Sequence, residues 1–301
     1  MSLARANLAR RRGFTLAELL VVMGILAVLG VLTAVTVQRI SRDSRVASAT
    51  NTVTSTLGAA RALAIRDNAV VLVAFRPIWD INNRQKPQQT EMVIAKWSGE
   101  SAIFNTYPDG SKDIADRFVP ADGFQAVRLP VGVKVAGPLY EFGSDGVWVT
   151  QGEMPQIMQG CKESIEYSRM IAIMFAPDGS LVTRNPNASS GDTKSFVDFN
   201  KSDLTPGDFD PQDVTAGSCA TSTFDKYWKQ DDVNDECNLT IVPYLAVFDD
   251  RAARERKSLD WSVPGNQLGE LVGPNGYITT YSDRIHFNRY TGVAEVQGAS
   301  Q

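Results

Sequence analysis

The chain has 301 residues, of which 43% are apolar and 21% charged, so its composition fits a folded globular body and excludes a wholly disordered chain. The formal net charge is −4, and the first 13 residues contain four arginines and no acidic residue, so the remainder is more acidic than the whole. An acidic body matches a phosphate backbone poorly, and nucleic-acid binding is therefore not expected.

Residues 14–37 form an apolar run whose one charged residue is Glu18. About 20 apolar residues are enough to cross a bilayer as a helix. The arginines before the run predict a cytoplasmic N-terminus and export of everything after Val37. A secretory signal peptide would have an apolar core of about 7–15 residues and a cleavage site after it. Here the change in composition falls before the run, at Gly13, which predicts a leader over 1–13 and a transmembrane helix over 14–37.

Glu18 has two interpretations that the sequence leaves open. Thr15 and Glu18 have the spacing of a capping box, in which the carboxylate also benefits from the helix dipole. Alternatively, cleavage after Gly13 would expose the α-amine of Phe14, which could pair with the Glu18 carboxylate in lipid, within one chain or between neighbouring chains. Pairing between chains would set the register of an assembly.

The sequence RRRG followed by FTLAELLVVMGILAVL, residues 10–29, resembles the class III signal of prepilins. This resemblance implies that a prepilin peptidase cuts after Gly13 on the cytoplasmic side and N-methylates Phe14, and that Glu18 serves assembly. Many pilins carry a proline late in this helix, whereas the first proline here is Pro77, so local melting of the helix is not predicted.

The apolar run is predicted to continue as an amphipathic helix over residues 38–67. Two sets of apolar or small residues recur there every seven positions: Val46, Val53 and Ala60, and Thr50, Leu57 and Ala64. The stripe is too short and too rich in alanine for a convincing coiled coil, so we expect it to pack on a sheet.

The stretch TLGAARALAIRDNAVVLVAF, residues 56–75, is similar to the helix-to-strand passage of the GspH/FimT group of minor pseudopilins. The match is carried by Arg61, Ala64, Ile65, Asn68 and Val70. Together the two resemblances cover residues 10–75. They imply a long N-terminal helix packed on a mainly antiparallel, β-rich, pilin-like head, which is an α+β fold.

Residues 68–301 show the alternation of β-branched and aromatic residues with turn signals that is typical of a β-rich head. Strands are predicted near 69–75, 91–97, 125–135, 139–141, 146–149, 168–176, 180–184, 239–248, 276–280, 284–288 and 292–297. Asp-Gly turns are predicted after Pro108, Ser144 and Pro177, and a further turn at Thr291-Gly292. The basic stretch 251–261 predicts a short helix with a solvated face rather than a DNA contact.

Residues 185–237 are rich in acidic residues, glycine, serine and proline, and predict a long surface insertion. Two acidic groups offer clustered carboxylates of the kind that calcium binds, although a solvated loop is the preferred interpretation. They are Asp208, Asp210 and Asp213, and Asp231, Asp232 and Asp235. The chain has three cysteines, Cys161, Cys219 and Cys237, and no C-x-x-C pair, which makes a structural zinc site unlikely in principle. In an exported body, a disulfide between Cys219 and Cys237 is the expected pairing, although sequence does not fix the connectivity.

No catalytic motif is present: the sequence lacks G-x-S-x-G, a phosphate-binding loop and H-E-x-x-H. The single histidine, His286, lies in a predicted strand and is expected to be a packed or surface residue. The chain is therefore predicted not to be an enzyme and to need no cofactor.

Three functions remain for the chain. The resemblances favour a structural minor pseudopilin in the short periplasmic filament of a type II secretion system, in which the precursor spans the inner membrane with a periplasmic head. Its partners would be other pilins or pseudopilins and the prepilin peptidase. The alternative is a minor pilin of a type IV pilus, used in adhesion, motility or DNA uptake. A membrane-tethered binding protein or enzyme is disfavoured by the missing catalytic residues.

Overall fold

The computed structural model describes residues 16–80, 83–106, 112–139, 147–150, 170–183, 194–199, 239–257 and 276–298. The chain divides into two compact units, Met1–Ser44 and Arg45–Gln301. One helix, α1 (Leu16–Asp67), contributes residues to both units.

Helix α1 is uninterrupted over 52 residues and contains no proline. It ends in a left-handed cap, because Asn68 has a φ of 47° and the N–H of Ala69 donates to the carbonyl of Ala64 over 3.1 Å. Arg66 lies in the last turn, where a positive charge complements the helix dipole. Within the part of the chain that is described, no helix meets the length and apolarity required for a bilayer crossing.

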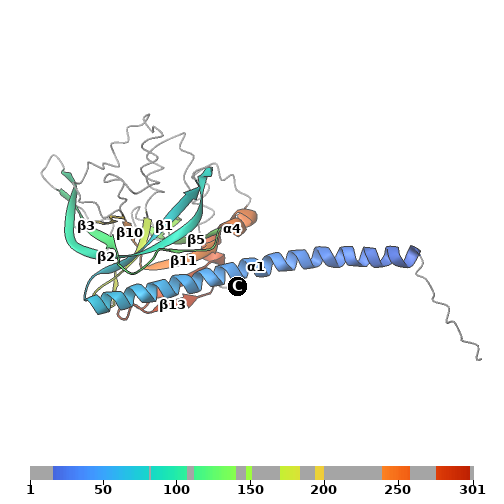
Figure 1. Ribbon diagram of the computed structural model, residues 1–301, viewed down its shortest axis with the longest axis horizontal. Helices are drawn as coiled ribbons and strands as arrows, with labels where there is room; N and C mark the ends of the chain where they lie inside the picture. The colour runs from blue at the N-terminus through green and yellow to red at the C-terminus, as the bar shows by residue number, and fades with distance from the viewer. Residues whose placement is uncertain are drawn as a thin grey trace, which may run out of the picture. The chain divides into compact units, whose positions relative to one another are not determined.

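The larger sheet, sheet A, has eight strands in the described part of the chain. Its strands β1, β2, β3 and β10 are labelled in Figure 1. Its main order is β10-β7-β1-β2-β3-β9, with β4 on β2 and β8 on β7. The strands are β1 (Val71–Asp80), β2 (Asn83–Thr106), β3 (Lys112–Pro120), β4 (Val127–Arg128), β7 (Met170–Phe175), β8 (Leu181–Val182), β9 (Lys194–Val197) and β10 (Leu239–Ile241). Two pairs, β10–β7 and β3–β9, are parallel, and the others are antiparallel. Strands β9 and β10, at opposite ends of this order, contact each other, so the sheet curls strongly.

The smaller sheet, sheet B, is antiparallel throughout its described strands, in the order β13-β12-β11-β5-β6. These strands are β5 (Val133–Leu139), β6 (Val147–Thr150), β11 (Tyr244–Asp249), β12 (Asp283–Phe287) and β13 (Ala294–Gln297). The predicted mainly antiparallel, β-rich head is thus confirmed, and with α1 it gives the predicted α+β fold.

The main core lies between α1 and both sheets. Five small or apolar residues of α1 are at most 1% exposed: Ala49, Val53, Leu57, Ala60 and Ala64. They pack with alternate residues of β1, namely Val71, Val73 and Phe75, and with residues of β2, β5, β7, β11 and β12. The residues between them in β1, Leu72 and Ala74, belong to a second core inside the curl of sheet A. The predicted packing of the helix stripe on a sheet is therefore confirmed.

A third core covers the other face of sheet B. Helix α4 (Asp250–Lys257) packs there, and its start is capped by Asp249, whose carboxylate accepts the N–H of Ala252 at 2.7 Å. This is the short helix predicted at 251–261.

The predicted strand at 276–280 is wrong: helix α6 (Tyr277–Tyr281) occupies this position. Tyr277 and Ile278 are both buried, and two consecutive side chains can enter one core from a helix, whereas a strand would point them in opposite directions.

Two other predicted strands are each divided by a turn. The run 125–135 becomes β4 and β5, separated by a turn at Gly132, whose φ is +84°. The run 239–248 becomes β10 and β11, because Pro243 has no N–H with which to continue the pairing. The predicted turn after Pro177 is confirmed, with Gly179 at a φ of +81°. The predicted Asp-Gly turns after Pro108 and Ser144 lie outside the described residues.

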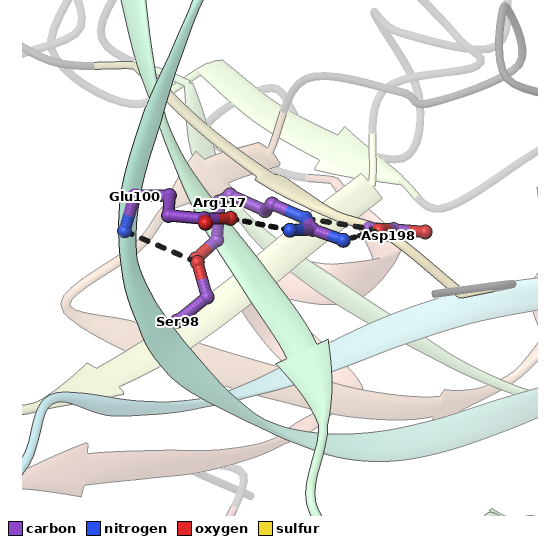
Figure 2. A network of polar contacts seen from close by, with 4 residues as sticks. All are labelled: Ser98, Glu100, Arg117 and Asp198. Carbon is purple, nitrogen blue, oxygen red and sulfur yellow. Dashed lines mark hydrogen bonds and ion pairs between the residues drawn. The ribbon is translucent and has the colours of Figure 1, made fainter. Parts of the chain in front are cut away.

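Strand β9 differs from the predicted surface insertion at 185–237. It pairs in parallel with β3 inside sheet A, and Asp198, which directly follows it, is fully buried. Arg117 of β3 donates to one carboxylate oxygen of Asp198 from Nε and Nη2, over 3.0 and 2.5 Å, and also contacts Glu100 (Figure 2). The sequence around Asp198 is typical of a loop, and a partner 81 residues away makes its burial possible. The rest of the predicted insertion, from residue 200 to 237, lies outside the described residues.

We expect Asp198→Ala to destabilise the head by about 3–5 kcal/mol, because it leaves the largely buried guanidinium of Arg117 without its buried counter-charge. The matched control is Glu100→Ala, which removes the 66% exposed carboxylate from the same arginine and should cost no more than about 1 kcal/mol. Denaturant unfolding of the purified full-length variants measures both. If both variants lost the same free energy of unfolding, burial of Asp198 would not explain the importance of its ion pair with Arg117.

Candidate functional site

The candidate site is the N-terminal part of α1, where the predicted processing and assembly residues lie. Gly13 and Phe14 are outside the described residues. Glu18 is exposed in the first turn of α1, a position where a carboxylate interacts favourably with the helix dipole. The geometry therefore fits a role at the helix start, while its pairing with the Phe14 amine stays a prediction.

The surface of α1 from Leu16 to Gly30 is apolar on every side. Large apolar residues that are 48–82% exposed occupy nearly every position, so they cover the full circumference of the helix: Leu16, Leu19, Leu20, Val21, Val22, Met23, Ile25, Leu26, Val28 and Leu29. A helix that is apolar all round requires an apolar environment, such as other helices or lipid. Its chemistry is therefore that of packing, and apart from Glu18 it offers no charged side chain.

The second half of α1 is attached to the head by polar contacts as well as by the core. Near its start in this unit, Arg45 lies 3.7 Å from the carboxylate of Asp249, the residue that caps α4. One turn later, the hydroxyl of Thr50 donates to the carboxylate of Asp283 on β12 over 3.4 Å. These contacts tie the helix to sheet B.

Near the end of α1, Arg61 ties the helix to both sheets. Its Nε donates to the carbonyl of Gly179, in the β7–β8 turn, over 3.2 Å and to the carbonyl of Thr291, in the β12–β13 turn, over 2.5 Å. The two turns also touch directly: a Cβ on Gly292, which has a φ of +64°, would lie 2.1 Å from the carbonyl oxygen of Gly179. Helix α1, sheet A and sheet B therefore meet at one point, called here the Arg61 junction.

Of the residues that carry the second resemblance, Arg61 and Ile65 lie at this junction, and the others follow along the end of α1 and into the start of β1. Ala64 is fully buried, Asn68 forms the left-handed cap, and the carbonyl of Val70 accepts the N–H of Trp97 over 2.9 Å. Their roles are structural. Gly179 and Gly292 were predictable as turn residues. The hydrogen bonds of Arg61 to the carbonyls of Gly179 and Thr291 were not predictable, because they join residues that lie 118 and 230 positions apart and that no local pattern relates.

Groups suited to catalysis or metal binding do not converge within the described residues. The ring of His286 stacks on Tyr244, with centroids 5.0 Å apart, and burial together with the charge of Arg284 lowers the pKa of His286. It is therefore a packed, neutral residue at pH 7, as expected. The described residues hold no group of three or more side chains arranged to bind a metal ion. The acidic groups at 208–213 and 231–235 and all three cysteines lie outside the described residues.

We expect Arg61→Ala to destabilise the head by about 1–3 kcal/mol, because two turn carbonyls lose their donor. Gly292→Ala should be at least as damaging, since the new Cβ meets the carbonyl of Gly179. The matched control is Gly58→Ala, one turn earlier on α1, where nothing lies within 4 Å of the added Cβ. It should stabilise the helix by about 0.5–1 kcal/mol. Thermal unfolding of the full-length variants measures all three, and an Arg61→Ala variant as stable as the wild type would contradict the junction.

A comparison with known protein families supports the signal that was predicted in the N-terminal segment. Residues 8–34 match the family model of the prokaryotic N-terminal methylation motif. No curated protein and no solved structure matches the chain significantly. The matched range contains Gly13, Phe14 and Glu18 and reaches into the apolar helix described above. The match shows that the chain carries a prokaryotic N-terminal methylation motif, which is the predicted class III signal.

Proposed function

We propose that this protein is a structural minor pseudopilin of the GspH/FimT type, which is built into the short periplasmic filament of a type II secretion system. The observation that supports the proposal is the methylation motif at 8–34 at the start of a helix that is apolar on every side and whose continuation is packed into a β-rich head. The protein acts by assembly and not by turnover of a substrate.

The proposed mechanism follows the chain from its N-terminus. The precursor is inserted in the inner membrane with residues 1–13 in the cytoplasm and its head in the periplasm. Prepilin peptidase then cleaves between Gly13 and Phe14 and methylates the new Phe14 amine. In lipid an unpaired charge is costly and a paired charge is directional, so the Phe14 amine and the Glu18 carboxylate fix the register between neighbouring helices. The apolar flanks of α1 supply the lateral packing.

The proposal names two kinds of partner, the prepilin peptidase and other pilin-like subunits. A minor pilin of a type IV pilus would use the same processing and packing chemistry. Deletion of the gene in its native cell separates the two systems. Loss of protein secretion with pili retained supports the pseudopilin, and loss of pili or of DNA uptake with secretion retained would overturn it.

Processing is the first consequence to test. We expect the mature chain to begin with N-methylated Phe14, because the composition changes at Gly13 and Glu18 lies four residues beyond the cut. Intact-mass measurement of the membrane-extracted protein decides, with Gly13→Val as the variant that should remain uncut. A mature chain that starts after Val37 would identify an ordinary signal peptide instead.

The second consequence to test is the role of Glu18 in assembly. We expect Glu18→Ala to be cleaved, membrane-resident and as stable in the head as the wild type, but to lose association with partner pilins. The apolar run drives insertion, the head core begins about 30 residues later at Ala49, and what the substitution removes is the partner of the Phe14 amine. Co-purification of pilin-like partners provides the measurement, and Glu18→Gln tests whether the charge itself is required. Wild-type association of both variants would leave the carboxylate as a helix cap.

A further inference from the structure

The β12–β13 turn carries the most exposed aromatic residue of the described head. Tyr290 is 85% exposed, and Val293 and Val296, which follow it, are each 49% exposed. We call Tyr290, Val293 and strand β13 (Ala294–Gln297) the β13 surface. Aromatic residues such as tyrosine are enriched in protein interfaces relative to the rest of the surface.

The backbone of the turn is held firmly although its side chains are exposed. The side-chain oxygen of Asn288 accepts the N–H groups of Tyr290 and Thr291 over 3.0 and 3.1 Å. The N–H of Asn288 donates to the carbonyl of Val293, and the N–H of Gly292 donates to the carbonyl of Asn288. Arg61 fixes the carbonyl of Thr291 from the helix. A partner that binds Tyr290 would therefore lose little free energy to ordering of the turn.

Strand β13 is the last strand of sheet B, and within the described residues it pairs with β12 alone. The hydrogen bond from Asn288 to Val293 sets the alternation of the antiparallel ladder. By this alternation Glu295 and Gln297 direct their N–H and C=O groups toward β12, while Ala294 and Val296 direct theirs to the free edge. Val296 lies opposite Ile285, which is fully buried, yet Val296 itself is half exposed.

We propose that the β13 surface receives an extended strand from the head of a neighbouring pilin-like subunit, which pairs with Ala294 and Val296 and covers Tyr290 and Val293. The proposal rests on the function proposed above and adds where one head binds the next. Unpaired N–H and C=O groups at a sheet edge select a partner strand, since a lipid surface would leave them without hydrogen bonds. Glu295 on the same strand disfavours a nucleic acid.

The position of the β13 surface also favours a subunit of the same filament. The Arg61 junction holds the β12–β13 turn against the last turns of α1, the helix whose first residues carry the methylation motif. Ile65 of α1, which is 46% exposed, lies beside Gly179 in the same junction and extends the apolar area. Through α1, the head that carries the β13 surface is joined covalently to the segment that is proposed to assemble.

The location is tested by photo-crosslinking in full-length protein within cells that express its partner pilins. A photoreactive phenylalanine analogue replaces Tyr290 in one variant and Tyr281, a 47% exposed tyrosine on α6, in the control. We expect crosslinks to a pilin-like subunit from position 290 and at most a tenth as many from position 281. Equal yields from the two positions, or crosslinks from 290 to lipid or nucleic acid alone, would overturn the proposal.

The pairing itself is tested with Val296→Pro. The N–H that this substitution removes points away from β12, so the hairpin keeps its ladder while the free edge loses a donor. We expect association with partner subunits to weaken about ten-fold or more, with an unchanged melting temperature. Val296→Thr keeps the N–H and the branched shape, and should associate like the wild type.

If Val296→Pro lowers the melting temperature, Tyr290→Ser decides, because a side chain that is 85% exposed can be removed without loss of the fold. We expect it to weaken association by about ten-fold, as the loss of an aromatic anchor does. Wild-type association of Tyr290→Ser would refute the β13 surface while leaving the proposed function intact. A wild-type protein that captures no pilin-like subunit would instead overturn the proposed function.

Discussion

The packing of the second half of α1 against both sheets is the interaction on which the rest of the structure depends. Small residues such as Ala49, Ala60 and Ala64 let the helix backbone approach the sheets closely, and Val53 and Leu57 fill the space between them. Burial of a large aliphatic side chain contributes roughly 1.5–3 kcal/mol, so this one helix face supplies much of the stability of the head. Without it the inner faces of β1, β7 and β11 would be open to water.

Apolar burial alone would allow the helix to slide or rotate on the sheets, and polar contacts at both ends of the packed segment restrict this freedom. Arg61 must reach two carbonyls on two different turns, which fixes the end of α1 relative to both sheets. At the other end, Arg45 and Thr50 reach carboxylates of sheet B. Partly exposed polar contacts of this kind add little net stability, so their contribution lies more in the precision of the geometry.

A similar balance operates on the far face of sheet B. Lys134 of β5 is buried, and desolvation lowers its pKa, while Asp250 at the start of α4 opposes this shift from 3.1 Å. Asp250 also accepts a hydrogen bond from Arg254 one turn later. Asp250 thus attaches α4 to the sheet, whereas Arg251 and Glu255 form an exposed ion pair within the helix.

The sequence by itself determined the features that depend on local pattern. The apolar run with its arginines, Gly13, Phe14 and Glu18 identified the methylation motif, and the seven-residue recurrence of Val53 and Ala60 located the buried face of α1. Alternation and turn residues located β1 and the β7–β8 and β12–β13 hairpins, because period and backbone conformation are properties of short segments.

The tertiary structure decided what depends on distant partners. Asp198 is buried because Arg117 lies beside it, and β9 is a strand because β3 offers it an edge. Residues 277–281 form a helix because one core receives both Tyr277 and Ile278. The Arg61 junction needs three segments that fold together, and the free edge of β13 follows from the strand order. No local sequence pattern predicts these features, because each depends on contacts between residues far apart in the chain.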